Sequence, residues 1–166
     1  MIKAIVYTSN TGFTKKYAEM LGEEIKVPAY EFKESKQKLN PKEEIIYMGW
    51  IMAGGIKNYK KAQKIYNIKA VCPVGMGMPN EKQNNELIEK YQIKEKLFYL
   101  QGGFDKSKLK GIYKFMMNGL EKTVKPQLEN KPDKTTEDLE MLEMMVKGKD
   151  CVKKENLKEI INWIKK

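Results

Sequence analysis

The chain has 166 residues, of which 41 % are hydrophobic and 33 % charged, a balance typical of one folded globular domain and not of a disordered chain. The net charge is +10, and all 32 basic residues are lysine. There is no histidine, which excludes Ser-His and Cys-His nucleophile pairs and the usual zinc sites, so we expect neither hydrolytic chemistry nor a bound metal.

Strands and helices alternate along the first part of the chain. The apolar run "KAIVYTS", residues 3–9, predicts a strand, and residues 14–26 follow with helical spacing of apolar side chains. "VPAYEFKE", residues 27–34, is a weaker strand candidate, and "EEIIYMG", residues 43–49, is a stronger one. A short helical stretch follows at 59–66.

The alternation continues to residue 104. "IKAVCPVG", residues 68–75, predicts the fourth strand, and "KLFYLQGG", residues 96–103, predicts the fifth, with a helix between them. Continuous apolar strands separated by helices indicate a parallel sheet covered on both faces. We therefore expect residues 1–166 to form a single doubly wound α/β domain.

The pattern changes after Phe104. Residues 107–122 predict a helix, the polar stretch 125–136 contains two prolines and interrupts it, and residues 137–146 predict another helix. The chain ends with a narrow apolar helical stripe at Leu157, Ile160, Ile161 and Ile164. We interpret residues 105–150 as a helical insertion before the last helix.

The most informative segment joins the first strand to the first helix. Ser9, Asn10, Thr11, Gly12, Phe13 and Thr14 supply three hydroxyls, one amide and a flexible glycine at the point where a helix begins. Free N–H groups and the positive end of the helix dipole make this a natural place for a phosphate. The alternative is a helix N-cap rich in Ser and Thr, but one residue suffices for that. Neither GxGxxG nor GxxxxGK[ST] is present, so the loop suits a terminal monophosphate held by neutral donors.

The pattern S-x-T-G-x-T directly after a first strand resembles the phosphate loop of flavodoxins. The resemblance extends from the N-terminus to about residue 104. It implies a flavodoxin-like five-stranded sheet of order 2-1-3-4-5, bound flavin mononucleotide (FMN), and a role in redox or electron transfer. It also implies that two later loops surround the flavin ring; these comprise Trp50, Ile51, Met52, Ala53, Gly54 and Gly55 after the third strand, and Gly75, Met76, Gly77 and Met78 after the fourth. Flavodoxins place in the first of these loops a peptide that can flip toward the flavin, and the pair Gly54-Gly55 would make such a flip easy.

This chain departs from typical flavodoxins, which are acidic and often stack an aromatic ring where Met76 and Met78 stand here. Positive charge near a reduced, anionic flavin should raise its reduction potential. A basic flavodoxin-like domain with added sequence after the fifth strand is similar in layout to the menaquinone-dependent protoporphyrinogen oxidase branch. Five methionines would then line a site for a quinone-like or other apolar molecule, or else fill the core beneath the insertion; these are Met116, Met117, Met141, Met144 and Met145.

Three functions stay open at this point: an FMN-dependent electron carrier, an FMN-dependent oxidoreductase, and a binding module for another phosphorylated ligand. Whether the chain is an enzyme, and which side chains would be catalytic, is not decided by the sequence. The excess of lysine fits either a solvated surface or a face that attracts an acidic partner, such as a redox protein. It also allows peripheral contact with an anionic membrane. The absence of arginine speaks against nucleic acid.

Location is predicted from segments that the sequence lacks. Met1 leads directly into a strand, and the longest stretch without charge, residues 45–56, is too short to span a bilayer. Cys72 and Cys151 lie far apart and form no CxxC pair. These features predict a cytoplasmic, reduced protein without a transmembrane segment.

Overall fold

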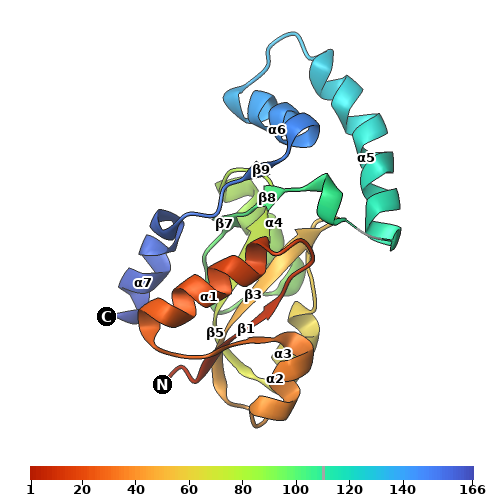
Figure 1. Ribbon diagram of the computed structural model, residues 1–166. Coiled ribbons are helices and arrows are strands. Elements are labelled where there is room, and N and C mark those ends of the chain that lie inside the picture. Colours follow the sequence, from red (N-terminus) through yellow and green to blue (C-terminus); the bar gives the residue numbers. More distant parts are fainter. Residues whose placement is uncertain (110) are drawn as a thin grey trace.

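The computed structural model describes residues 1–109 and 111–166. Its centre is a parallel sheet in which strands pair in the order β2-β1-β3-β5-β6 (Figure 1). The bounds of these strands are β1 Ala4–Thr8, β2 Ala29–Glu31, β3 Glu44–Met52, β5 Asn67–Gly75 and β6 Lys96–Leu97. The predicted fifth strand is divided in two, because β7 (Leu100–Gln101) also pairs in parallel with β5. The predicted doubly wound α/β class and the order 2-1-3-4-5 are therefore confirmed.

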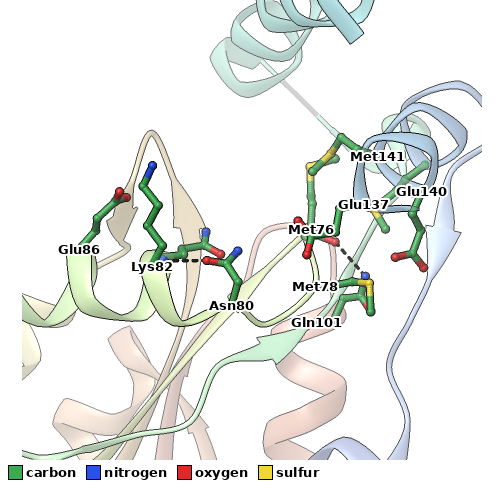
Figure 2. Close-up of a pocket in the computed structure, with 12 residues that line it drawn as sticks. Met76, Met78, Asn80, Lys82, Glu86, Gln101, Glu137, Glu140 and Met141 are labelled. Carbon is green, nitrogen blue, oxygen red and sulfur yellow. Dashed lines mark hydrogen bonds between the residues drawn. The ribbon is translucent and has the colours of Figure 1, made fainter. Parts of the chain in front are cut away.

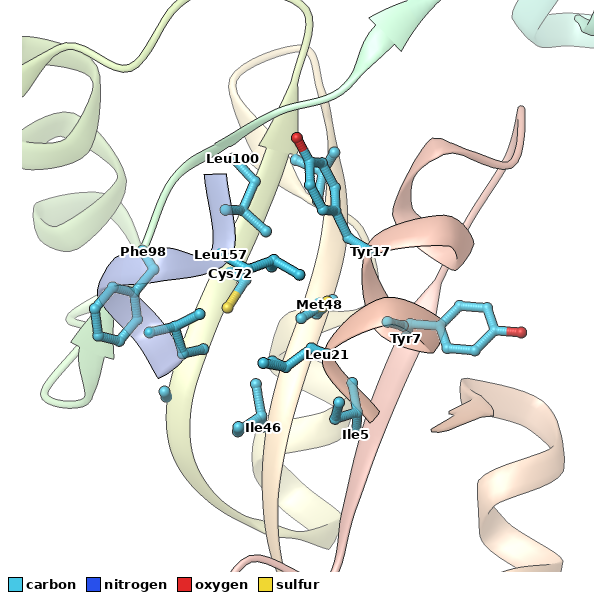
Figure 3. Close-up of a cluster of buried hydrophobic side chains, with 14 residues drawn as sticks. Ile5, Tyr7, Tyr17, Leu21, Ile46, Met48, Cys72, Phe98, Leu100 and Leu157 are labelled. Carbon is cyan, nitrogen blue, oxygen red and sulfur yellow. The ribbon is translucent and has the colours of Figure 1, made fainter. Parts of the chain in front are cut away.

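Alternate residues of each strand face opposite sides of the sheet. Ile46 and Met48 of β3 belong to one buried cluster, whereas Ile45 and Tyr47 belong to the other. Figure 3 shows the first cluster, which α1 and α7 cover. Helices α2, α3 and α4 cover the second. The helix bounds are α1 Phe13–Ile25, α2 Phe32–Lys38, α3 Tyr59–Ile65, α4 Glu81–Tyr91 and α7 Lys158–Ile164.

Helix α2 corrects the prediction of a strand over residues 27–34. The strand β2 ends at Glu31, whose carboxylate accepts a hydrogen bond of 2.9 Å from the backbone N–H of Lys33 and so caps the helix. Phe32 is 3 % exposed and packs against the sheet, with its ring edge to face with that of Tyr47. A cap and one buried aromatic anchor thus convert a segment with strand-like composition into a helix.

The segment after β7 leaves the sheet and returns to it. Strand β8 (Gly103–Phe104) pairs antiparallel with β9 (Lys149–Asp150), and between them lie a 3-10 turn at Lys106–Lys108, α5 (Gly111–Glu129) and α6 (Thr136–Lys147). In Figure 1, α5 and α6 stand beyond the ends of the central strands. No helix among the described residues is both long and apolar enough to cross a membrane.

Helix α5 is longer than the predicted helix over 107–122. It begins at Gly111 and continues through Pro126 to Glu129, so the first proline of the polar stretch does not interrupt it. A proline removes one backbone hydrogen bond of a helix, because it has no N–H. The helix can continue on both sides of the proline when that single bond is lost. The helix therefore ends at Glu129, before Pro132 and not at Pro126.

Candidate functional site

A cavity of about 280 Å³ opens where the central strands end. Loops of parallel strands meet at this edge, and ligands of open α/β sheets bind there. Its walls come from the loop after β1, the end of β3, the end of β5, the segment after β7, and the start of α5.

Most of the residues predicted for the cofactor line this cavity together. They are Ser9, Asn10, Thr11, Phe13, Thr14, Trp50, Ile51, Met52, Ala53, Gly75 and Met76. The others do not line it: Gly12 begins helix α1, Gly54 and Gly55 face α4, and Gly77 and Met78 line a neighbouring cavity. Three loops far apart in sequence thus converge on one space.

The loop after β1 has the geometry of an anion site. Gly12 precedes helix α1 with a φ of 98°, a left-handed conformation that favours glycine, and no side chain caps the helix. The N–H groups of the first turn therefore have no helical partner, and no acidic residue stands in that turn. The Ser9 hydroxyl oxygen accepts a bond of 3.2 Å from the Gly12 N–H, while the Thr11 and Thr14 hydroxyls make no hydrogen bond within residues 1–109 and 111–166. These hydroxyls are not used as caps, and their donors fit a phosphate monoester.

The end of β3 forms a hairpin that sequence analysis did not predict. Strand β4 (Gly55–Ile56) pairs antiparallel with β3, with Met52 opposite Gly55. The two turn residues, Ala53 and Gly54, have φ values of 48° and 65°, so the turn is of type I′. The Gly54 carbonyl accepts a bond of 2.7 Å from Lys90 Nζ, and a Cβ on Gly55 would lie 2.6 Å from the Tyr91 hydroxyl. The Gly54-Gly55 pair therefore contacts α4 and lies away from the cavity.

Aromatic and sulfur-containing side chains form the apolar wall. The rings of Trp50 and Tyr113 meet edge to face with centroids 5.2 Å apart. Met116 and Met117 of α5 and Leu109 complete this side. Such a wall suits the flat, largely apolar ring of a flavin.

The two alternatives for the methionines divide between residues. Met144 and Met145 are buried, at 1 % and 5 % exposure, and Met144 packs with Phe104 beneath the insertion. Met116 and Met117 line the first cavity, and Met117 also packs against this buried cluster. Met141 and Met144 line a neighbouring cavity. The first cavity is also lined by residues that were not predicted for the site, namely Val74, Gly102, Gly103, Phe104, Leu109 and Tyr113. Their positions depend on how the insertion folds back over the sheet.

A second cavity, of about 400 Å³, adjoins the first and shares Met76 with it (Figure 2). The start of α4 and the helix α6 form its sides. The backbone between the cavities is fixed by side chains, since Gln101 Nε2 donates to the Met76 carbonyl at 3.3 Å and the Tyr99 hydroxyl donates to the Gly77 carbonyl at 3.0 Å. Burial raises the pKa of Tyr99 to about 12 and keeps this hydroxyl protonated as a donor.

The fold and the cavity together define a doubly wound α/β protein whose cavity joins the uncapped N-terminus of the first helix to an apolar wall. The sequence profile of the Flavodoxin domain family matches residues 4–131, more than half of the chain, so the chain belongs to this family. Domains of this family generally bind flavin and take part in redox chemistry. No curated protein and no solved structure matches the chain.

Proposed function

We propose that this chain binds FMN in the 280 Å³ cavity and serves as an electron-transfer protein. The observation that carries the proposal is the convergence of an uncapped helix N-terminus with an aromatic wall in one cavity. The first supplies donors for a phosphate, and the second supplies a surface for a ring. Membership of the Flavodoxin domain family supports the same ligand.

Each part of the cavity then has a role. Ser9, Thr11 and Thr14 and the first-turn N–H groups of α1 hold the phosphate without a metal. The side that Trp50 and Tyr113 form would hold the ring. Bound FMN supplies electron or hydride transfer, while the protein orients the ring and sets the local electrostatics.

The proposal is tested by placing a negative charge in the phosphate loop. Thr11→Asp puts a carboxylate beside the phosphate, and two charges about 4 Å apart near a protein surface repel by about 4 kcal/mol, so FMN affinity should fall by at least about 100-fold. Thr11→Ser keeps the hydroxyl and is the matched control. Both are measured by quenching of FMN fluorescence.

Equal FMN affinity in Thr11→Asp and Thr11→Ser would show that the phosphate does not bind in this loop. If the unaltered chain binds phosphate but not flavin, the third function is favoured, namely a binding module for another phosphorylated ligand.

An oxidoreductase acting on an apolar substrate is the second candidate. It is favoured by one observation: Tyr113, Met116 and Met117 from the insertion line the cavity, and Met116 is 43 % exposed at its mouth. An adaptable methionine surface beside a flavin is suited to a flat apolar molecule such as a quinone. Steady-state reduction of a short-chain quinone separates this candidate from a carrier, which would show only a single turnover of its bound flavin.

A further inference from the structure

Three lysines lie beside the β3–β4 hairpin, the β3 end of which lines the cavity. Lys57 Nζ lies 5.5 Å from the ring centroid of Tyr113, and the Nζ atoms of Lys60 and Lys90 lie 5.4 Å and 5.9 Å from that of Tyr91. We call Lys57, Lys60 and Lys90 the basic rim. These ring contacts hold the ammonium groups in place at the surface.

The basic rim is fastened to the hairpin itself. The Tyr91 hydroxyl accepts a bond of 3.0 Å from the Ile56 N–H, and Lys90 Nζ donates to the Gly54 carbonyl at 2.7 Å. The backbone N–H of Lys57 donates a hydrogen bond of 3.0 Å to the Trp50 carbonyl. The positions of the three charges are therefore set by the hairpin. Three residues of that hairpin, Trp50, Met52 and Ala53, line the cavity.

The charges of the basic rim are not neutralised by carboxylates. Within the described part of the chain, none of the three ammonium groups forms an ion pair. Lysines elsewhere do so, as with Lys149 and Glu140 at 2.7 Å and Lys154 and Glu24 at 2.8 Å. Uncompensated charges gathered at the edge of a cavity raise the local potential and attract anionic surfaces.

The neighbouring second cavity carries carboxylates from α4 and α6. The second cavity is lined by Glu86, Glu137 and Glu140, with Lys82 as its only lysine among the described lining residues (Figure 2). Because Lys149 pairs with Glu140, the excess of negative charge on the α6 side is small, and the hairpin side, whose lysines are unpaired among the described residues, attracts an acidic surface more strongly.

We propose that the basic rim is a docking surface for an electron-transfer protein with an acidic face. This inference rests on the proposed function, because the electrons come from bound FMN. Full oxidation of the reduced flavin releases two electrons, taken in turn by one-electron centres on two partner molecules, and its protons pass to water. Charge complementarity sets the rate at which the partner meets the hairpin edge.

Two small redox proteins of opposite charge serve as probes: plastocyanin, which is acidic, and cytochrome c, which is basic. Each accepts one electron, so two are reduced for each flavin oxidised. The chain is loaded with FMN, its absorption spectrum is checked, the flavin is reduced, and reoxidation is followed by stopped flow at several salt concentrations.

The test variant carries Lys57→Glu, Lys60→Glu and Lys90→Glu. The control carries Lys38→Glu, Lys96→Glu and Lys166→Glu, three exposed lysines without ion pairs in the described residues, away from the cavity. Both variants have a net charge of +4, since three substitutions each remove two charges from +10. A milder variant with glutamine at 57, 60 and 90 covers the case in which charge reversal prevents folding.

At low salt, we expect the plastocyanin rate to fall about tenfold or more in the test variant and to change less than about threefold in the control. The cytochrome c rate should rise in the test variant. The glutamine variant should lie between the unaltered chain and the test variant. Equal effects of the test and control variants would overturn the docking surface, because net charge alone would then act. A colourless protein at the loading step would instead refute FMN binding itself.

Discussion

At the scale of single residues, three buried tyrosines fasten the loops that line the site. Tyr47 donates to the Lys57 carbonyl at 2.5 Å, Tyr17 to the Gln101 carbonyl at 2.6 Å, and Tyr99 to the Gly77 carbonyl at 3.0 Å. Each hydroxyl is held by the sheet or by α1 and reaches the backbone beyond a strand end. The phenols thus position three separate segments around the site without contributing to its walls.

Burial predicts how these tyrosines respond to alkaline pH. It raises the pKa of Tyr17 and Tyr47, and that of Tyr99 to about 12, above the ordinary value of 10.0. A raised pKa contributes stability that is complete below pH 10 and is lost as the pH rises from about 10 to 12. The free energy of unfolding, measured with urea, should therefore fall over this range.

The substitution Tyr99→Phe should make that fall shallower, because it removes one of the groups responsible. Tyrosinate absorbance near 295 nm gives an independent measurement, and the phenols of Tyr17, Tyr47 and Tyr99 should ionise only above pH 10. A single titration near pH 10 for every tyrosine of the folded chain would contradict this account.

At the scale of elements, the β3–β4 hairpin determines the shape of one side of the cavity. Its type I′ turn requires positive φ at both central residues, and Ala53 adopts it at a cost because its Cβ disfavours the left-handed region. Asparagine tolerates that region and glycine follows at 54, as in the preferred Asn-Gly turn.

We therefore expect Ala53→Asn to raise the melting temperature by a few degrees, since it relieves up to about 1 kcal/mol of backbone strain. Gly54→Val should lower it, because a β-branched residue at a φ of 65° costs about 1–2 kcal/mol. Differential scanning calorimetry checks both. A stabilising effect of Gly54→Val would show that the turn is not of type I′.

The elements differ in how far the sequence predicts them. Strands β1, β3 and β5 have apolar runs with turn residues after them, and these local patterns predict a parallel sheet, whereas its order was implied by the resemblance to flavodoxins. Helix α2 depends on Phe32 packing against Tyr47, a contact between separate segments that no local pattern contains. Helix α5 continues through Pro126, although a proline lacks the backbone N–H of one helical hydrogen bond, so the proline did not mark the end of this helix.

The candidate site likewise has one part that the local sequence predicts and other parts that depend on contacts between distant segments. The hydroxyl loop from Ser9 to Thr14 is contiguous in the sequence, so its chemistry could be predicted there. The sequence could not predict that Ala53 lines the cavity whereas Gly54 and Gly55 contact α4. That difference follows from hairpin pairing and from the contacts of Lys90 and Tyr91 with the hairpin. The wall from Tyr113 to Met117 depends on how the insertion lies against β3, as the contact of Tyr113 with Trp50 shows.

At the scale of the whole molecule, the parallel sheet brings loops of distant sequence to one edge, and the insertion covers part of that edge (Figure 1). Strands β8 and β9 pair with each other, so the insertion leaves and rejoins the domain at one place. The lysines of the basic rim are unpaired among the described residues, whereas Glu140 on the α6 side is paired with Lys149. A basic surface beside the cavity also favours a higher flavin potential than an acidic surface would.

The measurement that tests the central claim most directly is a visible absorption spectrum of the purified protein, with and without added FMN, followed by reduction with dithionite. We expect two flavin bands that sharpen as FMN enters the cavity and bleach on reduction, because the ring moves from water to the wall formed by Trp50 and Tyr113. A spectrum that remains the sum of free FMN and protein, even with FMN in excess, would contradict the assignment of the cavity to this cofactor.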